Sequence, residues 1–181
     1  MLPTRDKALE LLNEYVKDDY QRLHALMVAN ALEEYAIKLN EDKDLWFITG
    51  LLHDLDYFLY PEEHPNKSIE WFNEWNYPQE LIQAVAAHYW EKTGVEPNFK
   101  LGACLVACDE LCGFLYAYSL MRPEKFNGMQ ASSVKKKFKD STFAQKINRD
   151  DIVYGIEKLG VEFDSHVMLL ISVFEKMPEL K

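Results

Sequence analysis

Residues 101–121, LGACLVACDELCGFLYAYSLM, form an apolar segment long enough to be mistaken for a membrane-spanning helix. Asp109 and Glu110 lie near its centre. Each acidic residue in the middle of a membrane-spanning helix costs about 2.5–3.5 kcal/mol on insertion scales. We therefore expect this segment to be a buried core helix.

The rest of the chain also has the apolar spacing of helices, and strand-like alternation is absent. Prolines interrupt this pattern, most clearly at Pro61, Pro65 and Pro123. With 181 residues, of which 48% are hydrophobic, the chain is long enough for one domain with a substantial core. We therefore predict an all-α, single-domain helical bundle over residues 1–181. Its helices, about nine, are expected at residues 4–17, 20–39, 42–59, 66–75, 78–90, 98–121, 131–139, 150–159 and 164–177.

The chain is acidic, with 20 basic and 30 acidic residues and a formal net charge of −10. Such a surface argues against nonspecific binding of nucleic acids and against anionic membrane surfaces. It leaves open a small anionic substrate held by a metal or by a few local cations. Residues 1–15 lack a basic stretch followed by an apolar one, so we expect no secretory signal and a cytoplasmic protein. Whether the protein forms a homo-oligomer stays open.

Three cysteines, Cys104, Cys108 and Cys112, lie four residues apart in the apolar segment. Two interpretations are possible. The cysteines are functional, as thiolate ligands or redox groups, or they are small apolar residues along one helix face. The sequence contains no C-x-x-C pair, and a cytosolic protein keeps its thiols reduced. We therefore interpret the cysteines as core residues. His166, which lies near Phe163, is likewise interpreted as structural.

Several potential metal ligands fall on the inward faces of four predicted helices. They are His24, the doublet His53-Asp54, His88 and Asp109. Burying two unpaired carboxylates would cost several kcal/mol, whereas coordination of a divalent metal offsets this cost. Imidazole and carboxylate together suit Mn, Fe, Co, Ni or Zn better than Ca or Mg, although carboxylates leave Mg open. A metal site therefore explains why His53 and Asp54 lie side by side in an apolar region.

The order His24, His53-Asp54, Asp109 resembles the HD superfamily of metal-dependent phosphohydrolases. The stretches GLLHDLDY and HPNKSIEWF are similar to motifs of that family, and KKKFKD and the C-terminal helices resemble a little-characterised group of predicted HD hydrolases. In the family the first His, the doublet and the distant Asp bind a divalent metal. In some branches two more histidines, here His64 and His88, complete a two-metal site. The LDY after the doublet differs from the IGK or Glu of better-understood branches, so the resemblance implies no particular substrate.

The resemblance implies a helical bundle of the HD-domain type, with the metal site at about residues 20–121 and C-terminal helices at 131–177 packed on it. It implies hydrolysis of a small phosphate ester or nucleotide-like substrate by metal-activated water. One or two divalent ions would serve, from among Mn, Fe, Co, Ni, Zn and Mg. Two alternatives stay open: a di-iron oxygenase of the HD type, and a non-catalytic metal-binding sensor module.

The remaining candidates concern catalysis and the substrate. We expect Asp54 and Asp56 to be catalytic. Asp56, one helical turn from His53, is a general base, a residue that orients a ligand histidine, or merely solvated. Three basic residues are candidates for binding the substrate phosphate: Lys137, Arg122 and Arg149. The lysine run 135–137 is otherwise a solvated helix face.

Overall fold

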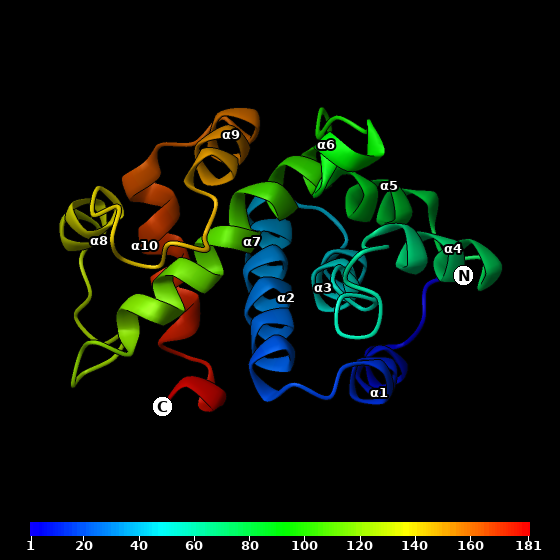
Figure 1. Ribbon diagram of the computed structural model, residues 1–181, viewed down its shortest axis with the longest axis horizontal. Coiled ribbons are helices and arrows are strands. Elements are labelled where there is room, and N and C mark those ends of the chain that lie inside the picture. The colour runs from blue at the N-terminus through cyan, green and yellow to red at the C-terminus, as the bar shows by residue number, and fades with distance from the viewer.

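The structure is a computed structural model that describes residues 1–181, and it contains helices and turns but no strand (Figure 1). The predicted all-α fold is confirmed. Ten α-helices are present, because the short α6 lies largely where the sequence indicated a loop. The elements are α1 Arg5–Tyr15, α2 Asp19–Leu39, α3 Lys43–Leu52, α4 Asn66–Glu74, α5 Gln79–Ala87, α6 Trp90–Thr93, α7 Lys100–Ser119, α8 Ala131–Phe138, α9 Arg149–Leu159, α10 Phe163–Phe174 and the 3-10 helix η1 Pro178–Leu180.

Two long helices, α2 and α7, organise the molecule. In Figure 1, α1 and α3 to α6 lie on one side of α2, and α8 to α10 lie on the other. A smaller apolar core fills the space between α1, α3, α4, α5 and one face of α2. A larger apolar core joins α2, α7, α8, α9 and α10. The predicted metal ligands lie where these two cores meet.

Helix α7 contains the long apolar segment, and by length and composition alone it could cross a membrane. In the structure 72% of its apolar window is buried inside the protein. The three cysteines are free and buried, and burial raises the pKa of Cys104 and Cys112. Helix α7 is therefore a core helix, as the sequence indicated, and its cysteines pack as apolar residues.

Helix α3 ends at Leu52, so the prediction that it extends to residue 59 is wrong. The backbone N–H of Asp56 donates to the Ser68 hydroxyl oxygen at 3.0 Å instead of to the carbonyl of Leu52. Residues 53–59 therefore form successive turns, and His53 is the C-cap of α3. Helix α5 likewise ends with His88 as its C-cap. Two predicted ligands thus lie at helix ends rather than within helices.

Glycines let two pairs of helices approach through their backbones. A Cβ atom on Gly50 of α3 would lie 2.8 Å from the Cα and N atoms of Ala29 on α2. A Cβ atom on Gly155 of α9 would lie 2.6 Å from the Cα atom of Ala107 on α7. Because Gly50 precedes His53 by about one turn, the first approach brings His53 close to α2.

His166 joins α10 to α2 and α7 and is 1% exposed. Its Nε2–H donates to the carbonyl oxygen of Ala107 at 2.9 Å, and its Nδ1 accepts from the Tyr35 hydroxyl at 2.5 Å. Both ring nitrogens are therefore satisfied in the neutral form. Burial, with a smaller contribution from the charge of Lys38, lowers the pKa of His166 to about 4. These contacts fit the structural role expected for His166.

We expect His166 to make the protein less stable in acid. Between the ordinary pKa of about 6.5 and the folded pKa of about 4, the unfolded chain binds a proton that the folded chain does not. The free energy of unfolding should therefore fall by about 3 kcal/mol more between pH 7 and pH 4 than in a His166→Gln variant, which has no such group. Urea unfolding of both proteins across this range measures the difference. Parallel pH curves would contradict the expectation.

Candidate metal centre

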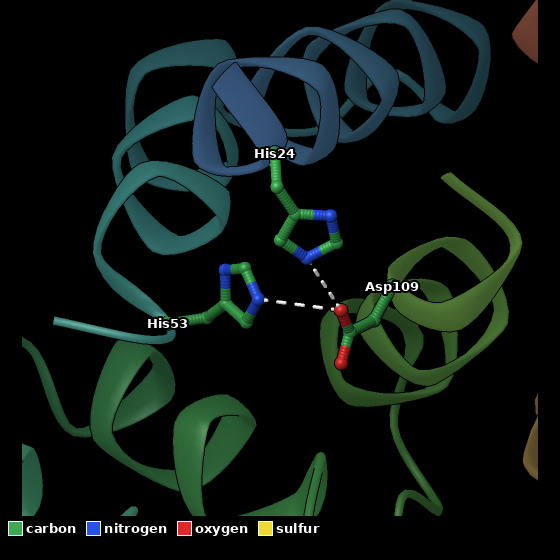
Figure 2. A group of neighbouring side chains, drawn as sticks. All are labelled: His24, His53 and Asp109. Atoms are coloured by element: carbon green, nitrogen blue, oxygen red, sulfur yellow. Dashed lines mark hydrogen bonds and ion pairs between the residues drawn. The ribbon is translucent and has the colours of Figure 1, made fainter. Parts of the chain in front are cut away.

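His24, His53 and Asp109 converge from α2, the end of α3 and α7 (Figure 2). The Nε2 atom of His24 lies 2.9 Å from Oδ1 of Asp109, and Nε2 of His53 lies 3.4 Å from the same oxygen. One potential ligand atom from each residue lies within 4.8 Å of the other two. The fold thus brings together three residues from distant parts of the chain, and His24 and Asp109 are 85 positions apart in the sequence.

Asp54, His64 and His88 form a second cluster. The Nε2 atoms of His64 and His88 each lie 3.4 Å from Oδ1 of Asp54, and they lie 3.0 Å from each other. The other oxygen of Asp54, Oδ2, lies 3.4 Å from Nε2 of His53 in the first cluster. Asp54 therefore links the two clusters, with one carboxylate oxygen facing each.

Hydrogen bonds determine which imidazole nitrogens are free. Nδ1 of His53 lies 2.7 Å from the carbonyl oxygen of Gly50, and Nδ1 of His88 bonds to the carbonyl oxygen of Val85. A carbonyl oxygen can only accept, so Nδ1 carries a proton in both rings and the neutral ring has its lone pair on Nε2. Nε2 of His53 is buried and has no hydrogen-bond partner. Both rings therefore present a metal-binding nitrogen to the clusters.

His64 comes from the turn region between α3 and α4 and is oriented by Asp56. Its Nδ1–H donates to Oδ1 of Asp56 at 2.7 Å, while Oδ2 of Asp56 accepts from the Ser68 N–H at 2.9 Å. The Asp56 side chain is fully buried behind His64. The prediction that Asp56 is catalytic is therefore not supported, because its carboxylate has no access to a substrate. Of the roles considered from the sequence, the geometry favours orientation of His64, an arrangement common behind metal-binding histidines.

The spacing of these atoms fits divalent ions. Two ligand atoms that each lie about 2.1 Å from one ion are about 3.0–3.4 Å apart in octahedral or tetrahedral geometry. The contacts in and between the clusters range from 2.9 to 3.4 Å. The Nε2 lone pairs of His64 and His88 face each other at 3.0 Å, which is repulsive unless a proton or cation lies between them. Donor types and spacing therefore both suit bound metal.

Electrostatics also favour a cation here. Burial alone would lower the pKa of His53, but the charges of Asp54 and Asp109 raise it well above its ordinary value. Burial alone would raise the pKa of these two carboxyls, but His53 lowers both. The carboxyls therefore stay ionised, which is the form that binds metal. Beside them, burial and then the charge of Asp109 raise the pKa of Glu110 to about 8, and burial and Glu91 raise that of Asp151 to about 6.

Both clusters open into one cavity of about 660 Å³, a size suited to a small molecule. The buried His53 lies beneath its floor, whereas the other five predicted ligands line it. Helices α2 and α7, the turn region after α3, the segment around α6, the segment before α9 and the start of α9 supply the rest of the wall. Residues of this wall that the sequence did not single out include Tyr20, Tyr57, Tyr89, Trp90, Lys146 and Asn148.

The three predicted phosphate-binding residues do not line the cavity. Arg122 donates to two carbonyl oxygens of its own loop, and Lys137 pairs with Asp140 at 2.8 Å. Arg149 donates to the carbonyl oxygens of five residues: Phe138, Asp140, Phe143, Ala144 and Ile147. Their predicted role is therefore not supported, because these cations hold local loops. The basic residue that reaches the wall is Lys146, whose position depends on the loop that Arg149 holds.

The fold and the site together define a helical protein with two clusters of histidine and aspartate side chains that could hold metal. Residues 23–111 match the family model of the HD domain, and this match supports membership in the HD superfamily. The match contains all six residues of the two clusters. It confirms the resemblance seen in the sequence and implies a superfamily of metal-dependent hydrolases. No curated protein and no solved structure matches the chain.

Proposed function

We propose that this protein is a phosphohydrolase that uses two divalent ions, from among Mn, Fe, Co, Ni, Zn and Mg, to hydrolyse a small phosphate ester. The observation that carries the proposal is the pair of three-residue clusters, linked by Asp54, at the base of an open cavity. Membership in a superfamily of metal-dependent hydrolases supports the same chemistry.

Ions bound at this centre would supply an activated water and offset the charge on the phosphoryl oxygens. The residues of the chain hold and orient the ligand atoms. Asp54 contributes one oxygen to each cluster. The carbonyl of Gly50 fixes the ring of His53, and Asp56 fixes that of His64, so that Nε2 of each faces the cavity floor.

Metal analysis of protein purified without chelator, followed by a panel of phosphate monoesters and diesters, tests the proposal. We expect close to two metal ions per chain, and hydrolysis that chelator abolishes and added metal restores. A metal-replete protein that hydrolyses no phosphate ester would overturn the proposal. Tightly bound iron with substrate-dependent oxygen uptake would instead indicate an oxygenase, and metal without any turnover would indicate a sensor module.

Lys92 on α6 offers a test of the two-ion arrangement. Its Nζ donates to the carbonyl oxygens of Glu62 at 2.7 Å and of His64 at 2.6 Å, so it anchors the backbone that carries His64. We expect a Lys92→Met variant to bind the ion of the second cluster, which contains His64, at least about tenfold more weakly. Supporting residues typically have an effect of this size on metal affinity. Binding of the first ion, which does not use His64, should change little.

Metal titration followed by elemental analysis of the dialysed protein measures this effect. Lys67→Met is the matched control, since Lys67 pairs with Glu70 on an exposed helix face and does not contact the centre. Equal metal content in the Lys92 variant, the control and the unmodified protein would show that His64 needs no anchor from α6.

A further inference from the structure

The cavity wall beside the second cluster is aromatic. The ring of Tyr57 lies edge-on to the ring of His64, with 5.2 Å between centroids, and the ring of Tyr89 lies 6.0 Å from His64. Tyr57 is 44% exposed and Tyr89 is 42% exposed, although both lie close to the buried side chain of His64. Exposed aromatic surface inside a cavity usually marks contact with a ligand. A flat, uncharged group of a substrate can cover these two rings.

The charges of the wall are uneven. Outside the metal clusters, Lys146 is the one lysine or arginine that lines the cavity, and it is exposed and forms no ion pair. Carboxyl groups are more numerous, and include Asp18, Glu91 and Asp151. A single negative group held by the ions and Lys146 is therefore favoured. A second phosphate elsewhere in the cavity would face carboxylates.

The backbone segment that carries Lys146 is fixed, although the ammonium group of Lys146 forms no ion pair. It lies in the segment between α8 and α9, whose carbonyl oxygens receive the guanidinium of Arg149. On the same segment, Ile147 and Asn148 also line the cavity. A fixed backbone with an unpaired ammonium suits a lysine that pairs with a bound anion.

We propose that the substrate is a monoester with one phosphate group and a flat, uncharged ring, the ring covering Tyr57 and Tyr89 and the phosphate pairing with Lys146. This inference rests on the proposed function, because it assigns the substrate class of the same site. A dianionic monoester also matches the charge of the centre, since two divalent ions with the carboxylates of Asp54 and Asp109 carry a net charge of +2. Substrates with a chain of phosphates are excluded by the acidic wall.

Binding and turnover are measured separately. Phenylphosphonate and butylphosphonate, which cannot be hydrolysed as esters, are compared by calorimetry with the metal-loaded protein. Phenyl phosphate, butyl phosphate and the 5′-mono-, di- and triphosphates of one nucleoside are compared by kcat/KM. We expect the phenyl compounds to be favoured about tenfold in both assays, the scale of stacking on an aromatic side chain. The nucleoside monophosphate should be favoured over its di- and triphosphate.

Variants assign the effect to residues. Tyr57→Leu combined with Tyr89→Leu should bring the phenyl and butyl compounds to within twofold of each other, mainly by weakening the phenyl compound. Lys146→Met should weaken binding of both phosphonates about tenfold without changing their ratio. Lys136→Met, an exposed lysine of α8 that does not line the cavity, is the matched control and should change neither.

The outcomes separate this inference from the proposed function. If the protein binds the two phosphonates equally, or if its preference for the phenyl compound survives the double tyrosine substitution, the ring of the substrate does not cover Tyr57 and Tyr89. If the triphosphate is turned over better than the monophosphate, the substrate is not limited to one phosphate group. A phenyl preference that is lost in the double variant supports the ring assignment, even if no ester is hydrolysed. In that case the absence of hydrolysis overturns the proposed function alone.

Discussion

Replacing Asp54 with asparagine is expected to empty both metal positions and to lower phosphoesterase activity at least about 100-fold. Each carboxylate oxygen of Asp54 faces a different cluster, at 3.4 Å from Nε2 of His53 on one side and 3.4 Å from Nε2 of His64 and His88 on the other. One substitution therefore removes a ligand charge from both clusters. Loss of a supporting residue alone costs about 10–100-fold in metal affinity, so loss of a shared ligand should cost more.

The asparagine side chain has nearly the same shape as aspartate, so the helical fold should survive. Circular dichroism checks that point, and elemental analysis with activity assays checks the metal and the catalysis. Asp6→Asn is the matched control, because Asp6 lies on an exposed face of α1 and lines no part of the cavity. Full metal content in the Asp54 variant would show that the centre does not depend on the shared carboxylate.

The sequence was informative about the ligands because buried polar residues are exceptional. His24 and Asp109 interrupt apolar helix faces, and His53-Asp54 follows an apolar run, so a site between these helices could be predicted from periodicity and the cost of burial. His88 follows from the same periodicity, whereas His64 follows only from the resemblance, and the structure brings both into one cluster with Asp54. The sequence also predicts that α7 is a core helix, because two acidic residues at its centre disfavour a membrane.

Other features could not be predicted because they depend on contacts between distant segments. The end of α3 at Leu52 follows from the bond between the Asp56 N–H and Ser68, which lies twelve residues further on. Lys146 enters the cavity wall because Arg149 holds its loop, and no spacing of residues signals such a loop. Arg149 has the charge expected of a phosphate-binding residue, but its guanidinium donates hydrogen bonds to five backbone carbonyl oxygens and does not line the cavity.

Gly155→Ala should be strongly destabilising, because α9 lies against the backbone of α7 at this position. The added Cβ would lie 2.6 Å from Cα of Ala107 and 2.6 Å from the carbonyl carbon of Val106. Backbone atoms cannot rotate away as a side chain can, so the two helices must separate. Overpacking of this kind typically costs about 1–3 kcal/mol and sometimes more, against a gain of about 1 kcal/mol from the better helix propensity of alanine.

We therefore expect the Gly155→Ala variant to lose about 2–3 kcal/mol of unfolding free energy, and its Tm to fall by about 5–10 °C. Gly113→Ala is the matched control within α7, where the added Cβ would meet only the ends of side chains, Tyr20 Oη at 3.3 Å and Ile147 Cδ1 at 3.4 Å. Urea and thermal unfolding of the metal-free proteins measure both changes. Because Ala107 precedes Asp109 by two residues, separation of α9 from α7 should also weaken metal binding. A Gly155 variant as stable as the control would show that α7 and α9 are not packed this closely in solution.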